Sequence, residues 1–306
     1  MSIGLCYNAE IRNNGTPVLV WDAIKNPRGH SWGLGFDCER YSRPASNIKE
    51  HSLYIQMDDG RDDIEWTPPH PNAFWAVDTH LGYDRRLEWA KKFDYVFTAQ
   101  KEGAERMRKD GIKRAHWLPL ACHPPAHPDI REMMVHPDKD SHCGDRGLDK
   151  QHDLVFVGFM QDPPAGEGYN NRLDYLDYLW KKFPNSWLSV ACFWEPMAVR
   201  YIRGRLGFNI SIRDDLNMRF FEILSTGTAE LSNSGQVGYE ELGFKDEEHF
   251  ISYDDMKYAV EKTEWFLKNH EERENIAKRG HDLVRSKHTY MDRVIQMLDI
   301  CEYDGT

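Results

Sequence analysis

This sequence lacks the features by which membrane, secreted and disulfide-bonded proteins are usually recognised. No apolar run approaches the roughly 20 residues that a transmembrane helix needs, and the N-terminal residues have no basic start followed by a long apolar core. The six cysteines form no C-x-x-C pair, which favours free thiols in a reducing compartment over a disulfide framework. We therefore expect a cytoplasmic protein without a transmembrane segment.

Basic residues are also few relative to acidic ones. The 306 residues include 39 Lys and Arg against 50 Asp and Glu, which gives a formal net charge of −11. Proteins that bind nucleic acid by neutralising many phosphates need the opposite balance, although a local basic groove is compatible with this charge. No internal repeat or low-complexity segment is visible. The length and the 40% hydrophobic content are typical of a globular protein of about two domains.

The first half of the chain predicts short strands that alternate with helices. We expect strands at residues 2–8, 17–22, 52–59, 73–78 and 95–100, and helices at 84–93 and 102–111. This rhythm predicts a mainly parallel sheet with helices packed on it. A stretch rich in proline, histidine and charge follows at residues 122–151, which indicates a linker.

The second half repeats the pattern. We expect strands at 153–159, 186–193, 229–234 and 249–255, and helices at 172–183, around 219–228, and over most of the remaining chain. The sequence therefore predicts two α/β domains, at residues 1–148 and 149–290, joined through a hinge near 136–150.

The segment "RFFEILSTGT", from Arg219 to Thr228, is the strongest candidate for a ligand site. Glu222 lies in this short apolar segment, which Gly227 and Thr228 close, and Asp214 precedes it by eight positions. Asp214, Asp215 or Asn217 can cap a helix here, and the N-terminus of that helix would favour the phosphates of a nucleotide. Glu222 would then accept hydrogen bonds from a ribose diol. The alternative is that Glu222 only complements the helix dipole and Gly227 only ends the helix.

A series of motifs extends this segment toward the C-terminus. In order, they are Asn-x-Ser, R-x-F-E-x-L-x-x-G-T, G-x-E-E-L, Y-D-D, H-E-E-R-E-x-I-A-x-x-G and H-T-Y-x-x-R-V. Together with "VDTHLGYD", "FDYVFTAQKEGAERMRKDGI" and "AHWLPLACHPP" upstream, they resemble group 1 glycosyltransferases, in the branch similar to spore maturation proteins of the CgeB type. The resemblance covers about residues 75–300.

The resemblance implies the α/β GT-B fold. In that fold two Rossmann-like domains face each other across a cleft, the C-terminal domain holds most of the nucleotide-sugar, and a final helix, here residues 291–306, crosses back to the first domain. It also implies that Glu222 corresponds to the ribose-binding glutamate and that Asp214 takes the place of the first acidic residue. The implied activity is hexosyl transfer from a nucleotide-sugar, with UDP as the expected carrier, to a hydroxyl acceptor.

The donor diphosphate needs positive charge. The adjacent acids of "MDDG" and "RDD", at residues 57–63, are not a spaced D-x-D pair, so we expect a metal-independent enzyme with no cofactor beyond its nucleotide-sugar co-substrate. Arginine grips phosphate oxygens in bidentate fashion, although each arginine could instead form a surface ion pair. We rank Arg203 and Arg205 first and add Arg172, Arg219, Asn217 and, near the end of the predicted strand at 153–159, Gly158.

The acceptor side is expected in the first domain, where Asp78 and His80 follow a predicted strand. Either could take the proton from an acceptor hydroxyl. The alternative is that Asp78 caps the next helix and His80 makes a structural hydrogen bond. A group of histidines and cysteines nearby fits no common zinc spacing, so we expect no metal site there: His116, Cys122, His123, His127, His136, His142 and Cys143.

Two other functions remain compatible with these residues. One is a non-catalytic coat or assembly protein that keeps the fold, and the other is a nucleotide-sugar epimerising or phosphorolytic enzyme of the same architecture. For a transferase, the acceptor could be a glycan, a lipid-linked sugar, a protein or a hydroxylated base in nucleic acid.

Overall fold

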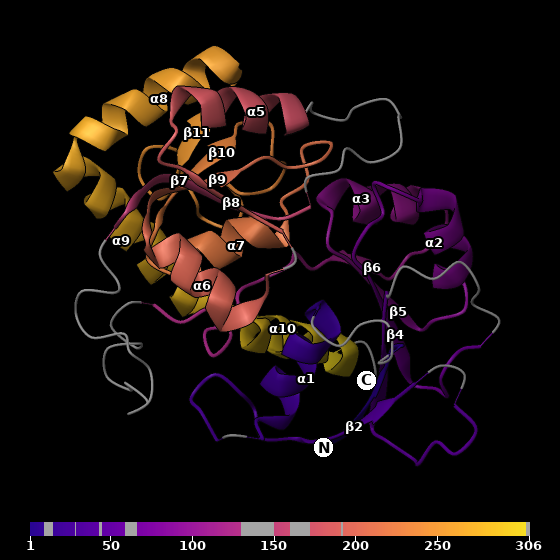
Figure 1. The fold of residues 1–306 in the computed structure, drawn as a ribbon. Helices are drawn as coiled ribbons and strands as arrows, with labels where there is room; N and C mark the ends of the chain where they lie inside the picture. Colours follow the sequence, from indigo (N-terminus) through magenta and orange to yellow (C-terminus); the bar gives the residue numbers. More distant parts are fainter. Residues whose placement is uncertain are drawn as a thin grey trace. The chain divides into compact units, whose positions relative to one another are not determined.

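The computed structural model describes residues 1–8, 15–27, 29–42, 45–58, 66–129, 150–159, 172–190 and 192–303. The chain divides into two compact units, each built around one parallel sheet (Figure 1). Unit 1 comprises Met1–Leu120 and Tyr290–Thr306, and unit 2 comprises Ala121–Thr289.

Unit 1 contains a six-stranded parallel sheet in the order β2-β1-β3-β4-β5-β6. Its strands are β1 (Ser2–Cys6), β2 (Asp37–Tyr41), β3 (Leu53–Met57), β4 (Asn72–Ala76), β5 (Tyr95–Thr98) and β6 (Ala115–Trp117). Its helices are α1 (Thr16–Lys25), α2 (Tyr83–Ala90), α3 (Lys101–Lys109) and the C-terminal α10 (Tyr290–Tyr303). All residues of β3 and β4 are buried, as expected for parallel strands covered on both faces.

The C-terminal helix α10 packs in unit 1, beside helix α1 (Figure 1). The fully buried Tyr290, at its first residue, meets Trp75 of β4 edge to face. Near the other end of the helix, the hydroxyl of Tyr95 donates a hydrogen bond to the carbonyl oxygen of Cys301 (3.0 Å). The return of the final helix to the first unit, which the resemblance implied, is therefore present.

One predicted element of unit 1 is wrong, and the strands β2 and β6 were not predicted. Residues 17–22, predicted as a strand, lie in helix α1, where Pro17 suits the first turn because its missing N–H needs no partner. Its buried apolar side chains recur at helical spacing: Leu19, Val20, Ala23 and Ile24. The edge strand β2 was not predicted, since Cys38 is its single buried residue.

Unit 2 contains a five-stranded parallel sheet in the order β11-β10-β9-β7-β8. Its strands are β7 (His152–Val157), β8 (Trp187–Ser189), β9 (Gly204–Asn209), β10 (Ala229–Asn233) and β11 (Ile251–Tyr253). Its helices are α5 (Arg172–Lys182), α6 (Trp194–Ile202), α7 (Met218–Ser225), α8 (Met256–Lys268) and α9 (His270–Lys287).

Apolar side chains of unit 2 pack on both faces of this sheet. One cluster joins Leu206 and Leu231 of the sheet to Leu176 of α5 and Phe266 of α8. A second cluster, on the opposite face, joins β7 to helices α6 and α7 through residues that include Val155, Met197 and Ile223. Helix α7, the segment singled out in the sequence, is thus held firmly against the sheet.

The boundary between the units lies earlier than the sequence indicated. We expected it after residue 148, but unit 2 begins at Ala121. The reason is a set of contacts within unit 2: the backbone N–H of Cys122 donates to the carbonyl oxygen of His288 (3.1 Å), and the hydroxyl of Ser225 donates to that of His127 (3.0 Å). Most of the predicted hinge, at 136–150, lies outside the described residues.

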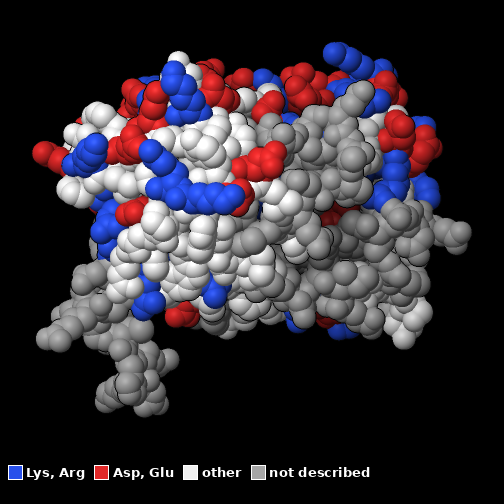
Figure 2. All heavy atoms as spheres, turned by 45° about the horizontal axis from the view of Figure 1, so that its top comes forward, with Lys and Arg blue, Asp and Glu red and all other residues white. Residues whose placement is uncertain are grey.

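The exposed charges are mixed. On the face drawn in Figure 2, basic and acidic side chains lie next to one another. Helices α5 and α8 show the pattern, with ion pairs from Lys181 to Asp177 (2.7 Å) and from Lys182 to Glu264 (2.9 Å). The described part of this face therefore presents no continuous basic stripe. No helix in the described ranges is long and apolar enough to cross a membrane.

Arg293 of α10 provides a test of how strongly this helix holds unit 1. The side chain is 1% exposed, and it donates to the carbonyl oxygens of Pro119 (2.8 Å) and Leu120 (3.4 Å). Arg293→Met leaves these buried carbonyls unpaired, so we expect the free energy of unfolding to fall by about 3 kcal/mol. Urea denaturation should show this loss, while the exposed Asp299→Ala on the same helix stays near wild type. Equal stability of Arg293→Met and wild type would show that α10 does not depend on this contact.

Candidate functional site

The candidate site lies at the carboxyl edge of the unit 2 sheet, between the central strands β7 and β9. The chain proceeds from β7 to β8 on one side and from β9 to β11 on the other, so the connections diverge at this point. Pairing of β7 with β9 ends at Val155 and Gly207, whereas β9 stays paired with β10 as far as Asn209. In open α/β sheets ligands bind at such a switch point, beyond the carboxyl ends of the strands.

Arg219, in the first turn of α7, joins the last residues of these two strands. Its Nε donates to the carbonyl oxygen of Val157 (2.8 Å), and its Nη1 donates to Oδ1 of Asn209 (3.0 Å). The guanidinium carbon lies 4.7 Å from the ring centre of Phe156, a cation–π distance. Among the described residues no carboxylate pairs with Arg219, so its neighbours leave its charge uncompensated.

Gly158 makes room for this guanidinium. A Cβ atom at position 158 would lie 2.3 Å from Nη2 of Arg219, so any larger residue would displace the arginine. Nη2 donates no hydrogen bond within the described part of the chain, which leaves its two N–H groups for a ligand. The sequence named Gly158 and Arg219 separately, and the structure brings them into contact.

Arg172, at the start of α5, bridges the residues that follow the same two strands. Its Nη1 donates to the carbonyl oxygen of Phe159 (3.1 Å) and its Nη2 to that of Ile210 (3.1 Å). The residue is 7% exposed. Arg172 therefore ties β7 to β9 where their backbone pairing has ended, and this use of its guanidinium is structural.

The loop between β9 and α7 carries two further predicted residues. Asn217 is the N-cap of α7 and accepts a hydrogen bond from the backbone N–H of Phe220 (3.1 Å), and its amide also bonds that of Asn209 (3.1 Å). Asp214 is exposed with a φ of 55°, and its Oδ1 accepts from Nδ2 of Asn233 (3.3 Å). Both residues precede the first turn of α7, at the positive end of the helix dipole.

Glu222 lies in the second turn of α7 and is 6% exposed. Its Oε1 is 3.3 Å from Nε2 of His127. Because Nδ1 of His127 accepts a hydrogen bond from the backbone N–H of His123 (3.2 Å), the proton of the neutral ring is on Nε2 and faces the carboxylate. The contact does not have the alignment of a hydrogen bond, so it is mainly electrostatic. A dipole-complementing role alone does not account for this pairing.

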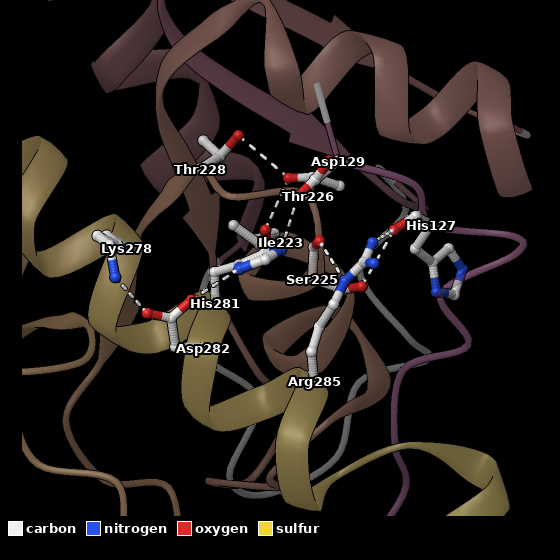
Figure 3. Close-up of polar contacts among 10 residues, drawn as sticks. All are labelled: His127, Asp129, Ile223, Ser225, Thr226, Thr228, Lys278, His281, Asp282 and Arg285. Carbon is white, nitrogen blue, oxygen red and sulfur yellow. Dashed lines mark hydrogen bonds and ion pairs between the residues drawn. The ribbon is translucent and has the colours of Figure 1, made fainter. Parts of the chain in front are cut away.

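The backbone of His127 is held by helices α7 and α9 (Figure 3). Ser225 Oγ (3.0 Å) and Arg285 Nη2 (3.0 Å) both donate to its carbonyl oxygen. Two residues later, Oδ2 of Asp129 lies 3.1 Å from Nε2 of His281. These contacts fix the imidazole opposite Glu222. The sequence gave no signal for this role, because the partners of His127 lie about 100 residues or more away in the chain.

Gly227 and Thr228 lie at the opposite end of α7 and terminate it. Gly227 has a φ of 73°, in the left-handed region that favours glycine. Thr228 is fully buried, and its hydroxyl donates to the carbonyl oxygen of Tyr201 (2.9 Å). Gly227 therefore fits the helix-ending alternative, and the hydroxyl of Thr228 makes a structural hydrogen bond.

Arg203 and Arg205, ranked first from the sequence, lie at the amino edge of the sheet. Gly204 begins β9 and pairs with His152, at the start of β7. Arg205 donates to Oδ1 of Asp153 (2.8 Å). It thus forms an ion pair, the alternative to phosphate binding for this arginine. The whole length of β9 separates both arginines from the switch point, so we correct the ranking and place Arg219 first.

Glu230 is a residue of this region that the sequence did not single out. It lies in β10 with its side chain fully buried, and its Oε1 accepts from Nδ2 of Asn209 (3.0 Å). Burial raises the pKa of its carboxyl group well above the usual range, and hydrogen bonds from Asn209 and Ser232 offset this only in part. In the predicted strand "AELSNS", Glu230 gave no sign that it lies in the core.

In unit 1, the predicted Asp78 and His80 follow β4 at the carboxyl edge of the sheet. The Asp78 side chain is 41% exposed, and its Oδ2 lies 3.9 Å from Nη2 of Arg86. Arg86 is buried and also donates to the buried Asp58, which follows β3. Helix α2 has Gly82 as its N-cap with no side-chain hydrogen bond, so Asp78 does not cap it. His80 is half-buried.

Several predicted features lie outside the described residues. They are the adjacent acids at 59–63, and His136, His142 and Cys143 of the histidine- and cysteine-rich stretch.

Comparison with known proteins gives a match over the second half of the chain. Residues 188–299 match a family model described as "Glycosyl transferase-like". This range includes Arg219, Glu222 and Glu230. No curated protein sequence is similar enough to this chain to count as a match.

Solved structures are similar over nearly the whole chain. A sucrose-phosphate synthase from Thermosynechococcus elongatus has a TM-score of 0.60 and 10% identity, over 99% of this chain and 98% of its own. Anabaena Alr3699/HepE in complex with UDP and glucose has a TM-score of 0.62 and 10% identity, over 99% of this chain and 100% of its own. An alpha-glucosyltransferase in complex with UDP and a 13-mer DNA has a TM-score of 0.62 and 11% identity, over 98% of this chain and 99% of its own. The expected α/β class and GT-B fold are confirmed, and the finer resemblance to the CgeB-type branch stays a prediction.

The buried Glu230 should make stability depend on pH. An unfolded chain releases a glutamate proton near pH 4.3, whereas burial raises the pKa of Glu230 in the folded protein. Between these two pKa values the folded state holds the extra proton, so the free energy of unfolding falls as pH rises. The glutamine of Glu230→Gln cannot ionise. Above the pKa of the unfolded chain, we therefore expect the free energy of unfolding of the variant, relative to wild type, to increase by about 1 kcal/mol per pH unit. Urea denaturation at a series of pH values measures this difference, and a difference that stays constant with pH would contradict it.

Proposed function

We propose that this protein, which has the GT-B fold, transfers a hexosyl group from a UDP-linked sugar to a hydroxyl acceptor, without a metal ion in the donor site. The observation that supports it most is the arrangement at the switch point of unit 2. There, Arg219, the N-terminus of α7 and Glu222 lie within two turns of one helix. A nucleoside diphosphate carries the two chemical groups that such a site would bind, a diphosphate and a ribose diol.

The diphosphate would be bound by Arg219 and the amides of α7. The guanidinium is held by the carbonyl oxygen of Val157 and by Asn209, which leaves Nη2 beside Gly158 to donate to a phosphate oxygen. The N-terminus of α7 adds a positive potential that favours a phosphate. In this arrangement protein charge takes the place of a metal ion.

The ribose would be bound by Glu222. One carboxylate oxygen faces His127 at 3.3 Å, and the other can accept a hydrogen bond from a ribose hydroxyl. The side chain keeps 8% of its surface exposed, which matches contact with a single ligand group. UDP as the carrier is supported by the Anabaena protein Alr3699/HepE, which was solved with UDP, with UDP and glucose, and with UDP-glucose.

The acceptor hydroxyl would lose its proton to a group in unit 1. Asp78 is partly exposed at the carboxyl edge of that sheet, and Arg86 lies 3.9 Å away, on the side of the buried Asp58. The exposed carboxylate of Asp78 is the candidate that accepts the proton from the acceptor hydroxyl. His80, two residues later, is the second candidate base.

Glu222→Ala should weaken UDP binding without unfolding the chain. The variant loses a hydrogen bond between a charged acceptor and the ribose, a cost of about 1.5–3 kcal/mol or roughly tenfold to a hundredfold in affinity. Titration calorimetry with UDP and 2′-deoxy-UDP, with and without EDTA, measures this loss, and the exposed Glu240→Ala is the control. The penalty for the missing 2′-hydroxyl should shrink in Glu222→Ala. Unchanged affinity would remove Glu222 from the site, and binding that fails in EDTA would contradict a metal-free site.

Asp78→Asn should slow transfer and leave UDP affinity unchanged. A general base contributes about 10²–10⁴-fold to a rate, so the loss should lie in this range if Asp78 is the base. UDP release from UDP-glucose with a panel of hydroxyl acceptors, together with product analysis, measures it, and His80→Ala is compared in the same assay. Loss of UDP affinity would instead place Asp78 at the donor site.

The same assay on the wild-type protein separates the other functions. Wild-type protein that forms rearranged sugar would indicate an epimerising enzyme, and protein that only binds UDP would indicate a non-catalytic one.

A further inference from the structure

Glu230 is a buried carboxyl group that the fold does not require. It stands in β10 between Ala229 and Leu231, is 0% exposed, and has an Oε2 with no hydrogen-bond partner. Burying a carboxyl group with an unpaired oxygen costs free energy. An apolar side chain of similar size would fill the same space at lower cost, so stability gives Glu230 no role.

The one described side chain that connects Glu230 to the switch point is Asn209. Nδ2 of Asn209 donates to Oε1 of Glu230 (3.0 Å) and to Oγ of Ser232 (3.1 Å), and at a longer distance to Oδ1 of Asn217 (3.3 Å). Oδ1 of the same amide accepts from Nη1 of Arg219 (3.0 Å) and from Nδ2 of Asn217 (3.1 Å). Asn209 therefore stands between the buried acid on one side and the arginine and helix cap on the other.

This geometry permits a single orientation of the Asn209 amide. A guanidinium has donors and no acceptor, so Arg219 must face the oxygen of the amide. The NH₂ group then needs acceptors of its own, and Glu230 (3.0 Å) and Ser232 (3.1 Å) lie closer to it than Oδ1 of Asn217 (3.3 Å). Without Glu230 one of these acceptors is lost, and the amide is less firmly held.

We propose that Glu230 is a positioning residue of the donor site, which holds Asn209 so that its oxygen fixes Arg219 and the α7 cap toward the diphosphate. The proposal rests on the proposed function, because it assigns Glu230 to the binding of the same donor. Glu230 does not touch the ligand.

The protonated state of Glu230 agrees with this role. Burial raises the pKa of its carboxyl group well above the usual range, which favours the neutral acid and so less negative charge near Arg219. The other ionisable groups that interact with it are Tyr201 on α6 and Tyr253 on β11. A neutral acid orients the amide while the arginine keeps its charge for a phosphate.

A matched pair of variants separates positioning from structure. Glu230→Gln keeps the acceptor oxygen and the size of the side chain, and Glu230→Met keeps the size and removes the acceptor. We expect Glu230→Met to bind UDP about fivefold to tenfold more weakly than wild type, and Glu230→Gln to bind like wild type. Thermal unfolding should show both variants at least as stable as wild type, since neither buries an ionisable group. A purely structural residue would show the reverse, with lost stability and unchanged affinity.

A double-mutant cycle tests the route through Arg219. In an Arg219→Met background, replacing Glu230 by Met should cause no further loss of UDP affinity. A loss of equal size in both backgrounds would overturn the proposal, and so would a folded Glu230→Met that binds UDP like wild type or a Glu230→Gln that binds as weakly as Glu230→Met. Wild-type protein that binds no nucleoside diphosphate contradicts the proposed function itself, and with it the role of Glu230.

Discussion

The guanidinium of Arg219, placed between the carboxyl ends of β7 and β9, is the interaction on which the unit 2 site depends. Backbone pairing between these strands has ended where the arginine binds, so a side chain supplies the connection that the sheet no longer makes. Gly158 is required because a Cβ atom would overlap the guanidinium. Asn209 and Asn217 are required because their side-chain amides bond to each other, to Arg219 and to the first turn of α7. The position of α7, and thus of Glu222, follows from this network.

Glu222 depends on a second constraint, supplied by residues 121–129. This segment lies in unit 2, and its chain at His127 is fixed by hydrogen bonds from Ser225 and Arg285. The backbone N–H of His123 then selects the ring tautomer that faces the carboxylate. Without these hydrogen bonds the side chain of His127 could rotate away from Glu222. The bonds to its backbone and to its Nδ1 therefore keep this weak electrostatic contact in place.

Buried polar groups lie beside the candidate site residues of both units. Asp58 and Arg86 form a buried ion pair in unit 1, and Glu230 lies fully buried in unit 2. Such groups are expensive to remove from water and add little net stability. Their value lies in orientation, because a low-dielectric environment with fixed partners holds neighbouring side chains in one geometry. Both sets lie next to the residues proposed to bind or activate substrates.

The sequence by itself determined the parallel α/β organisation, the existence of α7 and the choice of Arg219, Glu222, Asn217 and Gly158, because apolar periodicity, caps and motifs are local properties. Only the tertiary structure decided which edge of the sheet each candidate occupies. Arg203 and Arg205 resembled phosphate ligands in sequence but begin a strand whose other end forms the site. The roles of His127 and Glu230 also depend on contacts between distant segments. Strand order and side-chain burial create these contacts, and a linear pattern carries no information on either.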